Sequence, residues 1–408
     1  MFGLDDERRG KTMDDRPLSG VRVLDFSRVV AGPFCGRLLA DQGAEVIKVE
    51  PPRRDLVRTA PPLVGGISSY FTHMNAGKLG VSADLADPEV AGLMARLAQG
   101  ADVFLENFRP GVLARFGLDA ETLLGNNPRL IYCSISGYGQ HGVWRDRRCY
   151  APVVHGEAGI IATNARLQDT AARPEALSHA DIQSGLMAMG AISAALFERE
   201  RSGRGRHLDI SLAEVSFYTN EFCAPELCGQ TGPASYAGAA SLLLTLGDGT
   251  QVATQGNPAD SFRDWVAAMQ RPELIEDPRF RRHRDRLQHR RELDSIILEF
   301  ASGFASFEAL YRCVDPHRIA VGIVRSVSEL AETEWARERG LVAEPSPGLR
   351  FPRVPYRSSR GEISATGPAP RRGEHNRKAL QQLLGLDETA LAALEERNAL
   401  CVAEDGTG

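Results

Sequence analysis

The chain has 408 residues, of which 43% are apolar and 25% are charged, and its formal net charge is −5. This composition excludes disordered, collagen-like and fibrous proteins, and the length favours two or three structural units with sizeable cores. The negative net charge gives no electrostatic reason to expect a nucleic-acid-binding protein.

The cysteines and histidines argue against disulfides and metals. The seven cysteines are scattered and form no C-x-x-C pair, and the nine histidines show no metal-ligand spacing. The N-terminus lacks the apolar segment of a signal peptide, and the longest near-apolar run, residues 185–197, is too short to span a bilayer. We therefore expect a cytoplasmic protein without a metal or a membrane partner.

Strand-like and helical segments alternate through the first half of the chain, after a leader at residues 1–16 that we expect to be disordered. Strands are predicted at residues 21–26, 45–49, 78–84, 102–106 and 130–136, and helices at residues 33–42 and 87–99. Pro33 and Asp87 mark helix starts, and Gly43 and Gly100 mark helix ends. The alternation predicts an α/β fold with a parallel sheet covered on both faces.

A long helix is predicted at about residues 182–201, followed by a strand at residues 207–212. Apolar residues appear on nearly every face of this helix, which indicates that it is buried. The composition then changes, and a loop rich in Gly and Pro at residues 229–238 precedes a predicted hairpin. The hairpin strands are expected at residues 242–246 and 250–254, and charged helices at residues 258–312.

A glycine motif, Gly137-Tyr138-Gly139-Gln140-His141-Gly142, matches the G-x-G-x-x-G pattern of dinucleotide-binding proteins. It follows a predicted strand, but no helix start follows it. The first strand–helix turn, where such a motif belongs, has no glycine fingerprint. We therefore expect no nicotinamide cofactor.

Lysine is rare, because only Lys11, Lys48, Lys78 and Lys378 are lysines among the 48 basic residues. A compact ammonium group suits a phosphate, so Lys48 and Lys78 are candidates for binding a polyanionic cofactor. Nearby arginines would complete such a basic site: Arg53, Arg54, Arg58, Arg109 and Arg115. A solvated charged surface is the alternative interpretation.

Asp181 stands where the long helix is predicted to begin. An aspartate at that place is typical of a helix N-cap, whose carboxylate accepts backbone hydrogen bonds. A carboxylate at the mouth of a sheet can also attack an acyl group, with nearby backbone N–H groups stabilising the oxyanion. The loop at residues 25–33, after the first strand, lies where α/β sheets bind ligands, although it also fits an ordinary connection.

Taken in order, these segments resemble the class III CoA-transferase family, the CaiB/BaiF group. The matching parts are residues 18–25, 31–33, 43–50, Asn75 with Lys78, 106–111, 136–139, Asp181, 199–213 and Gly373-Glu374-His375. The likeness is strong over roughly residues 18–215 and moderate over roughly residues 315–400.

The resemblance implies a Rossmann-like large domain with a parallel sheet, a smaller α+β domain, and an interlocked homodimer in which each chain threads through the other. The expected segments are a leader at 1–16, the N-terminal part of the large domain at 17–225, the small domain with its linkers at 226–320, the C-terminal part of the large domain at 321–400, and a tail at 401–408.

The resemblance also implies that Asp181 is the catalytic aspartate and that the substrates are an acyl-CoA and a carboxylic acid. Asp181 would attack the thioester, and the anhydride would then be converted into an aspartyl-CoA thioester. The acceptor acid would reverse these steps in a site that excludes water. With Lys48 added from the lysine argument, the residues expected to contact CoA are Val30, Ala31, Lys48, Asn75, Lys78, Asn107, Phe108, Arg109, Arg115, Ser136, Gly137, Tyr138 and Gly139.

Three alternatives remain open from the sequence. An acyl-CoA racemase or epimerase of the same superfamily needs a second acid/base, and the histidine used for this in the racemases is missing from Cys149-Tyr150-Ala151. His155 lies five residues after Tyr150 and is expected to face elsewhere. An isomerase that transfers CoA within one diacid and a non-catalytic CoA-binding protein are the other two.

The chain departs from the family in two places. The family often has Tyr-Asp where this chain has Tyr150-Ala151, and a glycine-run lid is represented only by Gly229-Gln230-Thr231-Gly232 and Gly238. The identity of the acids exchanged does not follow from the sequence.

Overall fold

A computed structural model describes residues 15–52, 55–168, 170–229, 241–360, 362–364 and 367–401. Most of the predicted leader and tail, Arg53 and Arg54, and the proposed lid after Gly229 lie outside the described residues. The chain forms two compact units, which are described separately. One contains Met1–Ala158, Pro174–Thr219 and Glu334–Gly408, and the other contains Gly159–Arg173 and Asn220–Thr333.

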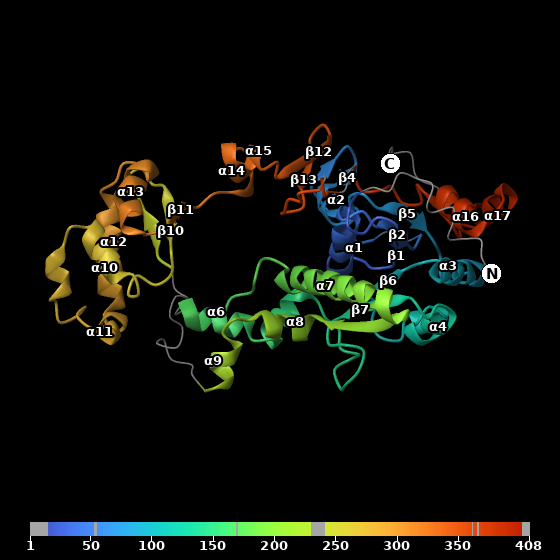
Figure 1. Ribbon diagram of the computed structural model, residues 1–408, viewed down its shortest axis with the longest axis horizontal. Helices are drawn as coiled ribbons and strands as arrows, with labels where there is room; N and C mark the ends of the chain where they lie inside the picture. The colour runs from blue at the N-terminus through green and yellow to red at the C-terminus, as the bar shows by residue number, and fades with distance from the viewer. Residues whose placement is uncertain are drawn as a thin grey trace. The chain divides into compact units, whose positions relative to one another are not determined.

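The first unit is built on a six-stranded parallel sheet with the strand order β5-β2-β1-β6-β7-β8 (Figure 1). The strands are β1 (Arg22–Asp25), β2 (Glu45–Glu50), β5 (Leu79–Ser82), β6 (Val103–Glu106), β7 (Ile131–Ser136) and β8 (Arg206–Ser211). If the small hairpin of β3 (Leu63–Val64) and β4 (Ile67–Ser68) is left out, this is the doubly wound order of dinucleotide-binding folds, which reverses between β1 and β6. The predicted α/β class with a Rossmann-like sheet is confirmed.

The sheet is buried on both faces, as parallel sheets are, and alternate residues of each strand enter two separate cores. Leu24, Ile47 and Phe104 point into one core, and Val23, Val46 and Leu105 point into the other. Helices α3 (Pro88–Gln99), α4 (Ala120–Asn126), α16 (Asn376–Leu384) and α17 (Glu388–Glu396) contribute to the first core. Helices α1 (Ala31–Asp41), α5 (Ala151–Glu157) and α7 (His179–Ser202) contribute to the second.

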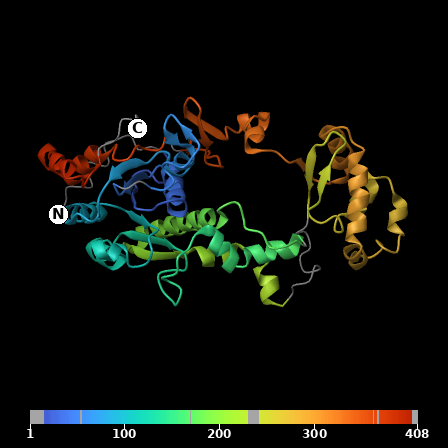
Figure 2. The same cartoon turned by 180° about the vertical axis from the view of Figure 1, so that it is seen from behind.

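The C-terminal segment returns to the first unit at the edge strand β5, and α16 packs on α3 (Figure 2). The backbone N–H of Gly80 donates to Nδ1 of His375 at 3.0 Å, and that of Ser82 donates to Oδ1 of Asn376 at 2.9 Å. The Gly373-Glu374-His375 segment therefore joins the C-terminal helices to the edge strand β5 of the sheet.

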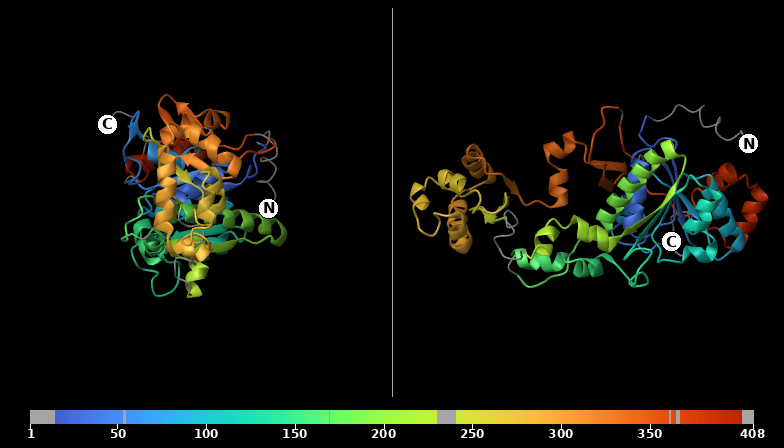
Figure 3. Two further views of the ribbon diagram at one scale, coloured as in Figure 1. Left: turned by 90° about the vertical axis from the view of Figure 1, so that its left-hand side faces the viewer. Right: turned by 60° about the horizontal axis from the view of Figure 1, so that its bottom comes forward.

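Helix α7 differs from its prediction in two respects. It begins at His179 with Ser178 as N-cap, so Asp181 lies within the first turn instead of capping it. It packs on α1 and β7 along one side (Figure 3), whereas Leu186 and Phe197 on its other side are 50% and 68% exposed. The prediction that α7 is buried all round was therefore wrong. By length and composition α7 is long and apolar enough to span a membrane, but the core helices of other proteins have the same property.

Shorter elements complete the first unit. They are β3 (Leu63–Val64), β4 (Ile67–Ser68), α2 (Ser69–Asn75), α8 (Leu212–Thr219), α15 (Glu334–Glu338), β12 (Val342–Ser346) and β13 (Leu349–Pro352). The turn chemistry explains several starts: Ser68 accepts a hydrogen bond from the N–H of Phe71 and so caps α2, and Asp87 caps α3 with Pro88 at its first position.

The second unit contains a three-stranded antiparallel sheet in the order β11-β10-β9. The predicted hairpin is present as β9 (Leu243–Thr245) and β10 (Gln251–Thr254), and β11 is Val321–Ile323. Trp265 and Phe280 are fully buried in the core of this unit. Its helices are α6 (Ile160–Gln168), α9 (Cys223–Leu227), α10 (Phe262–Ala268), α11 (His283–Gln288), α12 (Arg290–Ser302), α13 (Phe307–Val314) and α14 (Val327–Ala331).

The contact between α1 and α7 depends on Gly185. A Cβ atom at this position would lie 2.7 Å from the backbone oxygen of Ala31, which belongs to the first turn of α1. We predict that Gly185→Ala forces the two helices apart and lowers the free energy of unfolding by roughly 1–3 kcal/mol.

The matched control is Gly92→Ala, because Gly92 lies inside α3 and a Cβ there meets no atom within 4 Å. Alanine favours the helix, so this control is expected to raise stability by up to about 1 kcal/mol. Denaturant unfolding of both variants checks the prediction, and equal effects of the two substitutions would contradict it.

Candidate active site

A cavity of about 600 Å³ opens at the carboxyl ends of β1, β6 and β7, within the first unit. This is the point at which the strand order reverses, and open α/β sheets bind ligands there. Several residues predicted from the sequence line the cavity: Val30, Ala31, Asn107, Phe108, Arg109, Ser136, Gly137 and Asp181. The sheet topology therefore brings together residues that are up to 151 positions apart in the chain.

Lys48 and Lys78 were predicted to contact CoA, but neither lies on the cavity wall, and both are buried beneath it. The ammonium group of Lys78 donates to Oδ2 of Asp25 at 2.7 Å, to the backbone oxygen of Pro33 at 2.8 Å and to Oδ1 of Asn75 at 2.9 Å. An ammonium has three hydrogens to donate, so Lys78 has none left for a ligand. Lys48 donates to the backbone oxygen of Ser27 at 2.8 Å.

Four other predicted residues also lie off the described cavity wall: Asn75, Arg115, Tyr138 and Gly139. Asn75 is buried, and besides accepting from Lys78 it donates to the backbone oxygen of Phe71 at 3.0 Å. The guanidinium of Arg115 lies over the ring of Phe116, and that of Arg147 lies over the ring of Tyr138. A contact between CoA and these four residues stays a prediction.

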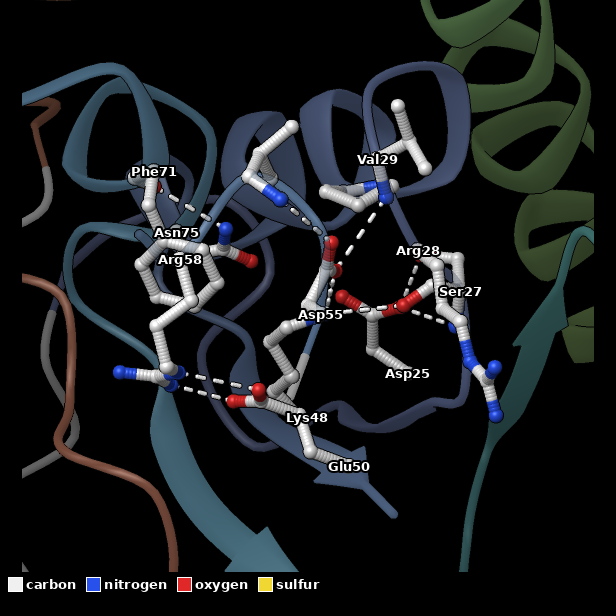
Figure 4. A network of polar contacts seen from close by, with 12 residues as sticks. Asp25, Ser27, Arg28, Val29, Lys48, Glu50, Asp55, Arg58, Phe71 and Asn75 are labelled. Carbon is white, nitrogen blue, oxygen red and sulfur yellow. Dashed lines mark hydrogen bonds and ion pairs between the residues drawn. The ribbon is translucent and has the colours of Figure 1, made fainter. Parts of the chain in front are cut away.

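The loop between β1 and α1 forms one wall of the cavity, and side chains from other elements hold its backbone (Figure 4). Asn107 accepts from the N–H of Arg28 and donates to the oxygen of Arg28, both at 2.7 Å. Asp25 accepts from the N–H of Ser27 at 3.0 Å, and Asp55 accepts from the N–H of Val29 at 3.2 Å. Consecutive peptide groups of this loop are therefore fixed from outside the loop.

Asp55 is a functional candidate that sequence reasoning missed. Its carboxylate is buried in the cavity wall, and its Oδ2 lies 3.8 Å from Nζ of Lys48. The segment around it is dominated by basic residues, Lys48, Arg53, Arg54 and Arg58, with Glu50 as the only other acid. No sequence signal marked it, because the burial of Lys48, which requires a nearby acid, is known only from the folded chain.

Asp181, which is half-buried, differs from the buried acids of this region, because no described residue donates a hydrogen bond to it or forms an ion pair with it. It projects from the first turn of α7, one helical turn before Gly185, where α7 touches the first turn of α1. Burial raises its pKa from 3.8 to about 6. The carboxylate is therefore ionised at neutral pH but is poorly stabilised, which suits a nucleophile.

Cys149 is another nucleophilic side chain on the cavity wall. Burial, and next the Asp181 carboxylate, raise the pKa of its thiol to about 11. The thiolate is the reactive form of cysteine, so Cys149 does not compete with Asp181 at neutral pH. The Cβ of Cys149 also packs on Gly137, where an added Cβ would lie 2.4 Å away.

His155 forms a hydrogen bond with the backbone at the start of α7. Its Nε2 accepts a hydrogen bond from the backbone N–H of Ala180 at 3.0 Å, so the imidazole takes the role of a cap beside Asp181. His155 is buried and does not line the cavity. Among the described residues that line the cavity there is no histidine.

The charge of the cavity wall is predominantly positive. Arg28, Arg109 and Arg148 line it, and the guanidinium of Arg28 stacks on the ring of Phe108 at 4.7 Å. Of the two acids on the wall, Asp55 faces Lys48. Guanidinium groups bind phosphates and carboxylates in a bidentate manner, so the cavity suits an anionic ligand. Among the described residues, no group of three or more His, Cys, Asp or Glu side chains is arranged to hold a metal.

The family model for "CoA-transferase family III" matches residues 18–376. The chain belongs to this family. It is 32% identical to a succinate–glutarate CoA-transferase of Agrobacterium fabrum, over 92% of this chain and 97% of that protein. It is 34% identical to a succinyl-CoA–D-citramalate CoA-transferase of Chloroflexus aurantiacus, over 94% of this chain and 98% of that protein.

A solved structure agrees with these sequence comparisons. The crystal structure of a CaiB/BaiF family protein from Brucella suis has a TM-score of 0.78 and 30% sequence identity, and the match covers 91% of this chain and all of that one. The resemblance drawn from the sequence motifs is therefore confirmed. As a family III member, this protein is a CoA-transferase that moves CoA between an acyl-CoA and a carboxylic acid.

The raised pKa of Asp181 predicts how its replacement changes stability. The carboxyl group has a pKa of 3.8 when unfolded and about 6 when folded, so above pH 6 the folded protein holds a charge that burial disfavours. As the pH falls through 6, the folded state takes up a proton before the unfolded state does, and the disadvantage disappears toward pH 4. Asp181→Asn should therefore be more stable than the wild type at pH 8, by up to about 3 kcal/mol.

Thermal unfolding at pH 5 to 8 measures this difference, which should shrink steadily as the pH falls. A difference that is independent of pH would show that folding does not shift the pKa of Asp181, and an Asn variant less stable than the wild type at pH 8 would show that the carboxylate is stabilised where it lies.

Proposed function

We propose that this CoA-transferase acts in the cytoplasm as a homodimer, exchanges CoA between dicarboxylic acids, and uses Asp181 as its covalent nucleophile. The observation that carries the proposal is the unpartnered Asp181 carboxylate in a positively lined cavity, beside the first turn of α1. Asp55, the other acid on the described cavity wall, faces Lys48, and the buried Asp25 pairs with Lys78, so Asp181 is the carboxylate that is ready to react.

The reaction proceeds by two acyl exchanges on each side. A carboxylate oxygen of Asp181 attacks the thioester carbonyl of the donor, the C–S bond breaks, and CoA leaves as a thiolate while a mixed anhydride forms. The thiolate then attacks the aspartyl carbonyl of the anhydride, which releases the donor acid and leaves an aspartyl-CoA thioester. The acceptor carboxylate repeats these steps in reverse, so the acyl activation is never lost to water.

The N-terminus of α1 is suited to stabilise the oxyanions of these steps. Its N-cap residue Val30 forms no side-chain capping bond, so the first backbone N–H groups have neither an intrahelical acceptor nor a side-chain one. Val30 and Ala31 line the same cavity as Asp181. Backbone N–H groups at a helix start favour negative charge, and preorganised donors of this kind lower the barrier to acyl transfer.

The dicarboxylic acids are proposed from the relatives and from the charge of the cavity. The relatives named above act on succinate, glutarate and citramalate derivatives. A dicarboxylic acyl group retains a second carboxylate after it has joined CoA, and that group requires a cation. Arg148, one residue before Cys149, supplies a guanidinium on the part of the wall that holds Asp181.

A panel of acyl-CoA donors and mono- and dicarboxylic acceptors tests the function, with the CoA products identified by mass spectrometry. We expect dicarboxylic pairs to exceed monocarboxylic pairs of equal length in kcat/KM. Asp181→Asn and Asp181→Ser should lose kcat by at least about 10³-fold, because neither side chain forms the anhydride. Both remain compatible with a first helical turn, so a thermal stability no lower than that of the wild type is the control for folding.

A wild type that leaves every donor unchanged would refute the proposed function and return the chain to a non-catalytic CoA-binding role. Transfer only within one diacid, with no free acid exchanged, would establish the isomerase alternative. The racemase alternative requires a second acid/base, and the described cavity wall offers no histidine for it.

The homodimer is proposed from the exposed apolar face of α7 and α8, two helices in contact. Its largest apolar side chains are Leu186, Met187, Phe197, Phe217 and Tyr218, and the last is 79% exposed. Large apolar side chains exposed on two helices in contact favour an interaction site, and a second copy of the chain is the partner that the family likeness implies.

Sedimentation velocity at decreasing protein concentration checks the dimer. We expect a single species of about twice the 44.4 kDa chain mass down to nanomolar concentration, because obligate dimers do not populate a folded monomer. Paired Phe197→Ser and Tyr218→Ser substitutions should weaken it, since they remove apolar area. A compact monomer that persists in the wild type would contradict the proposal.

A further inference from the structure

Val29 has a backbone conformation that its side chain disfavours. Its φ is 67°, in the left-handed region, where β-branched residues are genuine outliers. It lies on the cavity wall and directly precedes Val30, the N-cap residue of α1. Strain of this kind persists only where surrounding groups enforce it, and it gathers at functional sites.

Asp55 is the group that binds the strained residue. Its Oδ2 accepts the backbone N–H of Val29 at 3.2 Å, and its Oδ1 accepts that of Val57, also at 3.2 Å. Lys48 lies 3.8 Å from Oδ2 and also donates to the oxygen of Ser27, so it fixes Asp55 and the loop together (Figure 4). Both oxygens of Asp55 are therefore engaged by protein, although the residue belongs to the cavity wall.

The backbone conformation of Val29 sets the direction of the first turn of α1 relative to the preceding loop. The peptide groups before Val29 are held by Asp25 and Asn107, and those after it belong to the first turn of α1. A change of φ at Val29 to a negative value would therefore rotate the N–H groups of Val30 and Ala31 relative to the fixed part of the loop. Val30 and Ala31 both line the cavity that also holds Asp181.

We propose that Asp55 is a positioning residue for acyl transfer, whose carboxylate holds Val29 in the left-handed conformation and thereby directs the N-terminus of α1 toward the acyl group on Asp181. This inference rests on the proposed function, because it assumes that these N–H groups stabilise the oxyanion. It gives Asp55 no contact with the substrate's reacting atoms, and it predicts an effect on kcat more than on KM.

A rescue experiment tests the proposal. Asp55→Ala is measured in three backgrounds: the wild type, Val29→Gly and Val29→Ala. Glycine adopts a φ of 67° without strain, so the loop no longer needs Asp55, whereas alanine loses the same side-chain atoms but keeps most of the strain. Steady-state kcat and KM for an acyl-CoA donor are the readouts, with circular dichroism as the control for folding.

We expect Asp55→Ala to lower kcat about tenfold in the wild-type and Val29→Ala backgrounds, but less than about threefold in the Val29→Gly background. The KM for acyl-CoA should change less than about threefold in every background. An equal loss of kcat in all three backgrounds would overturn the proposal, since Asp55 would then act as a counter-ion for Lys48 or on the substrate itself.

Asp55→Asn serves if Asp55→Ala does not fold. It keeps the volume of the side chain but offers one acceptor oxygen to two N–H groups, and the same rescue by Val29→Gly alone is expected. The proposed function is tested apart from this, by the wild-type rate and by Asp181→Asn. Missing rescue in an enzyme whose Asp181 dependence is intact would overturn the positioning role alone.

Discussion

The arrangement of the active site depends on how the connection between β1 and α1 is held. A loop of this length has many conformations, and the one observed includes a valine at a positive φ. It is fixed by side chains that arise from β2, from the turn after β6 and from the segment that contains Asp55. Because β2, β1 and β6 are neighbours in the sheet order, the sheet itself brings Lys48 and Asn107 to this loop.

The pKa values of two aspartates near this loop are shifted in opposite directions. Asp25 is surrounded by compensation: burial alone would raise its pKa, but the ammonium groups of Lys78 and Lys48 outweigh burial and hold the pKa below its usual value. Asp181 has no such compensation, and burial raises its pKa to about 6. The lowered pKa favours the charged form of Asp25, which pairs with Lys78, whereas burial disfavours the charged form of Asp181.

Much of the fold follows from the sequence, because it depends on local signals. Strand and helix limits around Gly43, Asp87 and Gly100 agree with the structure within a few residues, since capping and turn chemistry are short-range effects. The exposure of one side of α7 could not be predicted, because the same apolar sequence pattern is expected whether the helix packs against its own chain or against another. The start of α7 also differed from the prediction. The N-cap residue is Ser178, which forms no side-chain capping bond, and not Asp181.

Only part of the candidate site could be predicted, because the role of several residues depends on their burial and on contacts between distant parts of the chain. Asp181, Asn107 and Gly137 are on the cavity wall as expected, because motif order and strand ends place them there. Lys48 and Lys78 are not, since a lysine that neutralises a buried aspartate cannot be told from one that binds a phosphate until its burial is known. Asp55 depends on contacts with Val29 and Lys48, and only the folded chain shows these.

The most direct test of the account is to trap the acyl group or CoA on the enzyme. Wild-type protein incubated with one acyl-CoA and no acceptor, then treated with borohydride or hydroxylamine, is digested and mapped by mass spectrometry. The account predicts modification of the peptide that contains Asp181, confined to that residue and absent from Asp181→Asn. Modification at another side chain, or turnover by Asp181→Asn without deamidation, would contradict it.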